Sequence, residues 1–185
     1  MFLILGLGNP GPRYELTRHN AGFLAIDNLA DIHRIDLSRH KFGALYGEGE
    51  IGESEVMVAK PMTYMNQSGK AARAILSALK IPPEQVIVVH DDIDLPLGKI
   101  KKKSQGGDGG QLGIRSITES IGTDRFHRVR IGIGRPECQE DIVDYVLSPF
   151  EEEEIPVLNE VIEQAVRMIE ATLNELNNST QLTEE

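Results

Sequence analysis

The stretch Gly6–Phe23, GLGNPGPRYELTRHNAGF, is the most informative part of the chain. It follows a short apolar run at Phe2–Leu5 and precedes an amphipathic run that begins near Ala21. An apolar strand, a polar loop and a helix, in that order, are where α/β proteins place their chemistry. His19 is the one side chain in the stretch that exchanges a proton near neutral pH, so it is the first candidate for a catalytic base.

The glycines of the same stretch suggest a second interpretation. Gly6, Gly8 and Gly11 spell G-x-G-x-x-G, the pattern of dinucleotide-binding proteins, and Asp27 follows roughly 20 residues later. In those proteins the third glycine lies in a helix whose N-terminus faces the pyrophosphate. Here prolines flank Gly11 and the apolar periodicity is delayed. The pattern therefore favours a nucleotide cofactor only weakly.

Length and composition indicate a single domain with a sizeable core, since the chain has 185 residues. One cysteine, Cys138, excludes an internal disulfide and fits a reducing compartment. The opening MFLIL lacks the basic region of a signal peptide, and no run approaches the roughly 20 apolar residues of a membrane span. We expect a cytoplasmic protein with no membrane partner.

The formal net charge of −10 at first disfavours a nucleic-acid partner, because Lys and Arg dominate phosphate binding. The charge is very unevenly distributed, however. Between Gly98 and Arg135, nine Lys and Arg residues stand against three Asp and Glu, whereas the chain beyond Arg135 has 14 acidic residues and one basic residue. A local basic face can still bind a polyanion, because salt limits the reach of each charge to about 10 Å.

Apolar periodicity predicts an alternation of strands and helices. The predicted strands are 2–7, 44–50, 55–59, 85–89, 100–103 and 129–133. The predicted helices are 21–32, with Asn20 as its N-cap, 65–79, 112–121, and 151–176 with a start near Pro156. We expect one α/β domain over residues 1–176, a mixed sheet with helices on both faces, and a disordered tail at 177–185.

The stretch His90–Gly98, HDDIDLPLG, has three interpretations. Imidazole and carboxylate groups are ordinary metal ligands, although neighbours on a strand point to opposite faces and do not converge without a turn. One aspartate could instead orient a distant histidine, as in a Ser-His-Asp triad. Finally, the aspartates could simply cap and turn the backbone. The spacing alone leaves all three open.

Three other stretches are also ambiguous. Lys60–Lys70, KPMTYMNQSGK, places an aromatic and an amide side chain at the start of a helix, where they either stack on and bond to a base or close the core. Lys99–Ser104, KIKKKS, puts alternate lysines on one strand face, which is typical of a solvated edge. The glycine pairs within 106–110 form either a backbone N–H cradle for phosphate or an oxyanion, or a mobile loop.

Together with FHRVRIGIGRP at 126–136 and DYVLSPF at 144–150, these stretches resemble the bacterial-type peptidyl-tRNA hydrolases in order and spacing, from Phe2 to about Phe150. The resemblance implies hydrolysis of the ester that joins a peptide to the 3′ ribose of tRNA. It also implies a single α/β domain with a twisted mixed sheet, and no metal or cofactor. We expect a monomer whose partner is peptidyl-tRNA.

The resemblance also implies roles for individual residues. His19 matches the general base that activates water, and Asp91 matches the partner that holds its imidazole, which selects the second interpretation of the aspartates. Asn9 matches the residue that senses whether the amino acid is blocked by a peptide bond. Lys103 and Arg130 match a clamp for the 5′ phosphate of tRNA. Four further residues match those that line the site for the tRNA end and the peptide, namely Tyr14, Tyr64, Met65 and Asn66.

The chemistry of the residues agrees with this resemblance. An activated ester needs no covalent nucleophile if water is positioned and deprotonated, so one histidine with a carboxylate partner is sufficient. Asn66 and loop N–H groups are the available donors for the oxyanion. Selection of peptidyl over free aminoacyl substrate is reasonable, because an amide differs from a charged ammonium in donors, acceptors and desolvation.

One pair of residues departs from the family's pattern. The family usually has a histidine and an asparagine after the second glycine pair, where this chain has Gln111 and Leu112. Leu112 lies at the matching binding position but can neither donate nor accept, so either Gln111 substitutes or binding is weaker there. The alternative function is that of a non-enzymatic RNA-binding relative of the same fold, since fold does not determine function. Retention of Asn9, His19, Asn66 and Asp91 together disfavours it.

Overall fold

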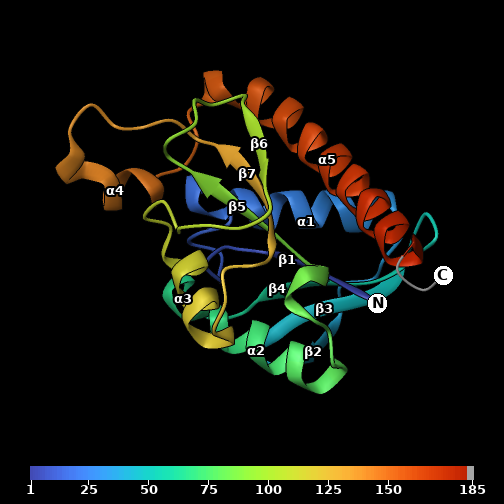
Figure 1. Ribbon diagram of the computed structural model, residues 1–185. Helices are drawn as coiled ribbons and strands as arrows, with labels where there is room; N and C mark the ends of the chain where they lie inside the picture. Colours follow the sequence, from blue (N-terminus) through green and yellow to red (C-terminus); the bar gives the residue numbers. More distant parts are fainter. Residues whose placement is uncertain (183–185) are drawn as a thin grey trace.

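The computed structural model describes residues 1–182, which form one seven-stranded mixed sheet with helices on both faces (Figure 1). The strand order is β2-β3-β4-β1-β5-β7-β6. The strands are β1 (Phe2–Gly6), β2 (Arg39–Lys41), β3 (Ala44–Ile51), β4 (Ser54–Pro61), β5 (Val86–Asp92), β6 (Ile100–Lys103) and β7 (His127–Gly132). The central β4, β1, β5 and β7 are mutually parallel, whereas β2, β3 and β6 add antiparallel edges. The predicted fold class is confirmed.

The helices form two layers. The elements are α1 (Ala21–Ile32), α2 (Ser68–Leu79), α3 (Leu112–Ile121), α4 (Ile142–Val146) and α5 (Ile155–Leu182), with 3-10 turns η1 (Arg18–Asn20), η2 (Met65–Gln67), η3 (Pro83–Gln85), η4 (Gln139–Asp141) and η5 (Glu152–Glu154). Phe2 and Ile4 of β1 pack with α1 and α5, whereas Leu3 and Leu5 pack with α2 and α3. Alternate residues of the central strand thus serve two separate cores, which explains its uniformly apolar sequence.

Close packing explains the first glycines of the chain. A Cβ atom on Gly6 would lie 2.2 Å from Ile26 Cγ1, and one on Gly22 would lie 2.3 Å from the carbonyl oxygen of Val89. The glycines therefore let α1 approach β1 and β5 closely. Because α1 begins at Ala21 and not directly after Gly11, the G-x-G-x-x-G pattern does not open a helix as a dinucleotide site requires.

Several predicted boundaries differ from the observed ones. The strand at 85–89 extends to Asp92, residues 65–79 divide into η2 and α2, and β2 was not predicted. α5 continues to Leu182, where a disordered tail was expected from residue 177, because Leu176 still packs on the core and the Thr180 hydroxyl bonds to its carbonyl. The remainder of that expectation, 183–185, lies outside the described residues. Over 1–182, no helix has the length and apolar character needed to cross a membrane.

Candidate active site

His19 and Asp91 form a buried pair, although they lie 72 residues apart in the chain. The η1 turn presents His19 immediately before α1, and the carboxyl end of β5 presents Asp91. His19 Nδ1 lies 2.7 Å from Asp91 Oδ2, and the two side chains are 11% and 2% exposed. Since a carboxylate only accepts, Nδ1 carries the proton of this bond.

The pair leaves the other ring nitrogen available. Burial alone would lower the pKa of His19, but the charge of Asp91 and its hydrogen bond outweigh this effect and raise the pKa above the ordinary 6.5. His19 Nε2 has no hydrogen-bond partner among residues 1–182, and His19 lines a cleft. The neutral imidazole therefore presents an unprotonated nitrogen to that cleft.

Asn9 lies beside this pair and is held by its neighbours. Its backbone N–H donates to Asn20 Oδ1 at 2.8 Å, and Asn20 Nδ2 donates to the carbonyl oxygen of Asn9 at 2.9 Å. Asn9 Oδ1 accepts from the backbone N–H of Met65 at 2.8 Å. This bond identifies the amide orientation, and it leaves Nδ2 of Asn9 without a partner in the described part of the chain. Asn20 occupies the predicted N-cap position of α1, but its side chain makes no capping hydrogen bond and bonds to the backbone of Asn9 instead.

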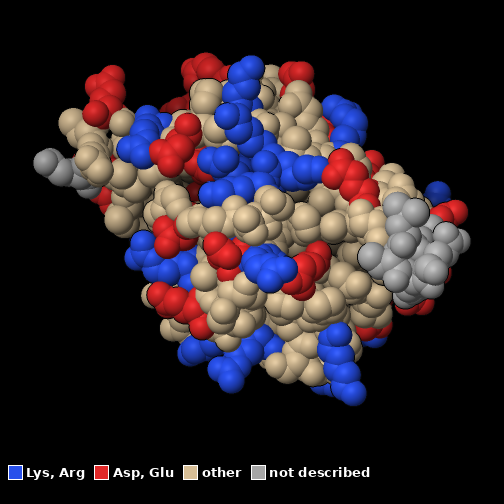
Figure 2. Space-filling view, viewed as in Figure 1, with Lys and Arg blue, Asp and Glu red and all other residues tan. Residues whose placement is uncertain are grey.

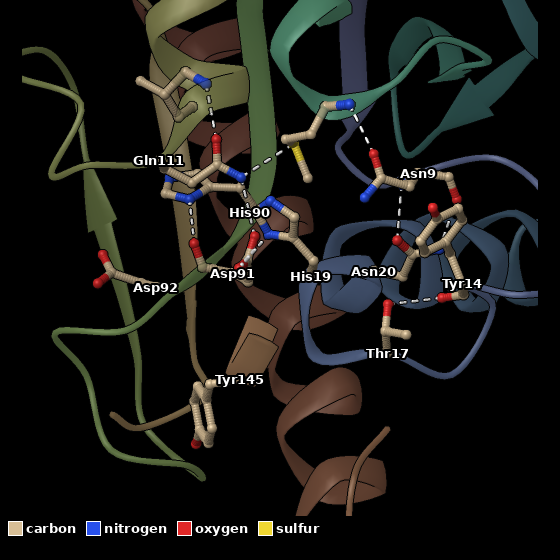
Figure 3. A network of polar contacts seen from close by, with 12 residues as sticks. Asn9, Tyr14, Thr17, His19, Asn20, His90, Asp91, Asp92, Gln111 and Tyr145 are labelled. Carbon is tan, nitrogen blue, oxygen red and sulfur yellow. Dashed lines mark hydrogen bonds and ion pairs between the residues drawn. The ribbon is translucent and has the colours of Figure 1, made fainter. Parts of the chain in front are cut away.

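Gln111, the residue before α3, joins the same network (Figure 3). Its Oε1 accepts from the backbone N–H of Ile114 at 2.9 Å. Its Nε2 donates to Asp91 Oδ1 at 3.0 Å and lies 3.2 Å from Met65 Sδ. Contacts therefore run without a break from His19 through Asp91, Gln111 and Met65 to Asn9.

Residues of this network line a cleft of about 380 Å³, a size suited to a small organic group. Predicted residues in its lining are Asn9, His19, Tyr64, Met65, Asn66, Asp91 and Leu112. Tyr64 is exposed, and Tyr14 packs edge-on against it with ring centroids 6.5 Å apart. The structure thus brings these eight predicted residues together.

One wall of the cleft was not predicted. It consists of apolar side chains of α4 and of the residue after it, and Leu112 lies among the lining residues with them. Val143 and Leu147 are 67% and 38% exposed, and Leu112 is 45% exposed. The spacing of Ile142, Val143, Val146 and Leu147 is the signal that could have indicated an amphipathic helix here.

The two predicted phosphate-clamp residues lie outside the cleft lining, on the neighbouring strands. Register pairs Lys101 with Arg130 and Lys103 with Arg128, so the four side chains share one face of β6 and β7. Figure 2 shows Lys and Arg side chains gathered over these strands. Arg130 Nε donates to Asp92 Oδ2 at 2.8 Å, and Asp92 lines the cleft, so the basic face begins at the cleft's edge.

The glycine-rich loop rests on the same basic face. Arg128 is 2% exposed and donates through Nη1 to the carbonyl oxygen of Gly107 at 2.7 Å, and Lys103 Nζ lies 3.4 Å from that oxygen. The N–H of Gly110 donates to Asp108 Oδ1 at 2.7 Å. That N–H is therefore already bonded within the loop, although Gly110 itself lines the cleft.

His90 faces away from the Asp91 side chain, as its neighbouring position on a strand predicts. Burial lowers the pKa of His90, and its Nδ1 donates to the carbonyl oxygen of Asp91 at 2.7 Å. Its Nε2 is buried and has no hydrogen-bond partner within residues 1–182. Among residues 1–182, no three His, Cys, Asp or Glu side chains lie close enough to share a metal ion.

Comparison with known proteins identifies the relatives of this chain. Residues 3–185 match the family model described as peptidyl-tRNA hydrolase. The chain is 45% identical over 174 residues to a peptidyl-tRNA hydrolase of Bacillus subtilis (strain 168), with 94% of this chain and 93% of the relative covered. It is 50% identical over 167 residues to that of Aquifex aeolicus (strain VF5), with 90% and 87% covered.

Solved structures agree with the sequence matches. The crystal structure of the peptidyl-tRNA hydrolase from Acinetobacter baumannii superposes with a TM-score of 0.87 at 37% identity, covering 96% of this chain and 94% of that one. A complex of a peptidyl-tRNA hydrolase with N-propanol superposes with a TM-score of 0.90, also at 37% identity, covering 96% and 91%. The similarity therefore extends across the whole domain.

Proposed function

Because the chain belongs to the peptidyl-tRNA hydrolase family, and is thus an enzyme whose substrate is peptidyl-tRNA, we propose that His19 is its general base and that Asp91 orients it. The observation that carries the proposal is the 2.7 Å bond between His19 Nδ1 and Asp91 Oδ2, with Nε2 left free at the cleft. This is the arrangement of base and orienting carboxylate that proton abstraction from water requires.

The reaction follows from this geometry. His19 Nε2 takes a proton from a water molecule as the water oxygen attacks the ester carbonyl carbon. The tetrahedral intermediate then collapses, its bond to the 3′ ribose oxygen breaks, and the imidazolium returns the proton to that oxygen. The products are tRNA with a free 3′ hydroxyl and the peptide acid, which releases the second proton of the water to solvent and becomes a carboxylate. Asp91 stabilises the imidazolium between the two steps, consistent with the raised pKa of His19.

Asn9 and Asn66 supply the polar contacts to the substrate in this proposal. Met65 N–H occupies Asn9 Oδ1, so Asn9 presents Nδ2 as a donor, suited to the carbonyl oxygen of a peptide bond and not to an ammonium group. A free aminoacyl-tRNA carries an ammonium at that point, which would leave Nδ2 facing another donor. Asn66 lines the cleft and is the candidate donor for the developing oxyanion.

The tRNA itself is placed by the exposed aromatic and basic groups. Tyr64, with Tyr14 against it, offers a surface on which a base of the acceptor end can stack. Lys103 and Arg130 clamp the 5′ phosphate, since both lie on the basic face that begins at the edge of the cleft. All of these groups come from one chain, which supports a monomer as the working unit, in the cytoplasm where charged tRNA is used.

The test is release of peptide from an N-blocked aminoacyl-tRNA in the presence of a chelator. Wild-type protein should turn over, and His19→Ala should lose about 10²–10⁴-fold in kcat, the usual contribution of a positioned general base. His33→Ala is the matched control, because His33 Nε2 also lies 2.7 Å from a carboxylate, Glu170 Oε1, but outside the cleft lining. Equal losses in the two variants, or full activity in His19→Ala, would exclude His19 as the base.

A further inference from the structure

Gln111 is the one side chain other than His19 that bonds to the carboxylate of Asp91 in the described part of the chain. The two oxygens of Asp91 are divided between them: Oδ2 accepts from His19 Nδ1 at 2.7 Å, and Oδ1 accepts from Gln111 Nε2 at 3.0 Å. Asp91 and Gln111 are buried, at 2% and 8% exposure. In such surroundings a hydrogen bond to a charged group is stronger and more directional than at the surface.

The orientation of Gln111 is itself determined by the backbone. An amide side chain can be turned so that oxygen and nitrogen exchange places, but only the oxygen can accept from Ile114 N–H at 2.9 Å. The nitrogen must then face Asp91 Oδ1 and Met65 Sδ. The first turn of α3 thus fixes which group Gln111 presents to Asp91.

We propose that Gln111 is a positioning residue, which holds the carboxylate of Asp91 so that His19 keeps its proton on Nδ1 and its lone pair on Nε2. The inference rests on the proposed roles of His19 and Asp91. Ile114 N–H donates to Gln111 Oε1. Gln111 Nε2 and His19 Nδ1 each donate to a different oxygen of Asp91.

The direction of these bonds makes a specific prediction for Asp91→Asn. Because Gln111 presents N–H, an asparagine at 91 must turn its oxygen toward Gln111 and its NH₂ toward His19. His19 Nδ1 would then have to accept, which places the ring proton on Nε2 and removes the base. The expected loss in kcat is about 10⁴-fold, the effect of a reversed tautomer in a His–Asp pair.

A second substitution should reverse the direction and restore activity. In Asp91→Asn with Gln111→Glu, one oxygen of the glutamate accepts from Ile114 N–H, and the other accepts from the NH₂ of the asparagine. The asparagine oxygen then faces His19 Nδ1 and accepts its proton again. The double variant also has the same number of carboxylates in the network as wild type, with their places exchanged. We expect it to be at least 10-fold faster in kcat than Asp91→Asn.

The single variant Gln111→Ala tests the same role without a change of charge. Residues that orient metal ligands typically contribute 10- to 100-fold to activity, and we expect a loss of about that size for a residue that orients a carboxylate. The loss should appear in kcat with KM nearly unchanged, because Asp91 and His19 act on the water and not on the tRNA. Thr123→Ala is the control: it removes a comparable local bond, from Arg125 N–H to Thr123 Oγ1 at 3.1 Å, beyond the other end of α3.

The outcomes separate the inference from its premise. Rescue in the double variant, together with a kcat loss in Gln111→Ala but not in Thr123→Ala, would support the role of Gln111, because a purely structural cap has no means of producing rescue. A folded double variant no faster than Asp91→Asn would overturn it while leaving His19 as base. Undiminished turnover in His19→Ala would instead overturn the proposed mechanism and the inference with it. Circular dichroism and thermal unfolding establish that each variant is folded.

Discussion

Arg18, the residue before His19, anchors the η1 turn through a partly buried ion pair. Its Nη1 and Nη2 donate to Glu154 Oε2 at 3.0 Å and Oε1 at 2.8 Å, and its Nε donates to Ser148 Oγ at 3.3 Å. The guanidinium carbon also lies 4.6 Å from the centroid of the Tyr145 ring. The two side chains of the ion pair are 5% and 24% exposed. The pair therefore ties η1 to the segment that leads into α5.

Replacing Glu154 with Gln keeps the shape of the side chain but leaves Arg18 as a buried cation without an anion. Removing one partner of a buried pair costs about 3–5 kcal/mol, and the partial exposure of Glu154 reduces this to about 2 kcal/mol. For a domain of this size, that lowers Tm by about 4–8 °C. The assay is urea unfolding followed by circular dichroism, with Tm measured in parallel.

The destabilisation should depend on pH with a definite sign. Burial alone would raise the pKa of Glu154, but the bonds from Arg18 and from Glu151 N–H, with the charge of Arg18, keep it below the ordinary 4.5. A carboxylate with a lowered folded-state pKa stabilises the fold above its unfolded pKa and stops doing so as the pH falls through the folded pKa. The difference between wild type and Glu154→Gln should thus be complete at pH 7 and shrink below about pH 4.5.

Glu84 provides the control for this experiment. Its pair with Arg125 is 3.5 Å long, and both side chains are more than half exposed, at 54% and 66%. Glu84→Gln should change stability by less than about 0.5 kcal/mol. Equal stability of wild type and Glu154→Gln at pH 7, or a difference that grows on acidification, would refute the assignment of Glu154 as the buried partner.

Two further predictions concern the reaction. Because the base must be neutral, the raised pKa of His19 predicts that kcat/KM falls with falling pH through a midpoint above 6.5. A pH–rate profile whose midpoint lies at or below 6.5 would contradict the pairing of His19 with Asp91. In filter binding, Lys103→Ala should weaken tRNA binding and reduce the slope of log K against log salt by about one. Lys102→Ala is the control and should leave the slope unchanged, because Lys102 lies on the opposite face of β6 and pairs with Glu175.

Periodicity was sufficient for most of the fold, because each central element is defined by its own apolar residues. The helix at 21–32 and the strand at 100–103 occur with the predicted bounds. β2 was not predicted, because all of its residues, Arg39–Lys41, are exposed. They form a strand only because they pair with β3. The end of α5 was not predicted, because a run with Asn, Ser and Thr is typical of a frayed tail. The packing of Leu176 on the core and the hydroxyl bonds to helix carbonyls exist only in the folded helix.

The candidate site likewise has residues that the sequence predicts and contacts that it does not. Residue type and resemblance indicated His19, Asp91 and Asn9, and the fold brings all three to the lining of one cleft. The second function of Asn20 was not predictable, since a residue directly before a helix reads as a cap and only the folded loop shows that its amide meets Asn9. Arg130 could be expected on a basic face, but its bond to Asp92 depends on strand pairing that the sequence does not display.

The hydrogen bonds of the network limit which residue types fit at position 111. The side chain must accept from Ile114 N–H and donate to Asp91 at the same time. An aspartate, the common choice for a helix N-cap, accepts but cannot donate, and would place a second carboxylate beside the first. A neutral histidine would offer one donor and one acceptor, and so does the glutamine amide. Gln111 thus fills both hydrogen-bonding roles at this position with a side chain that does not titrate.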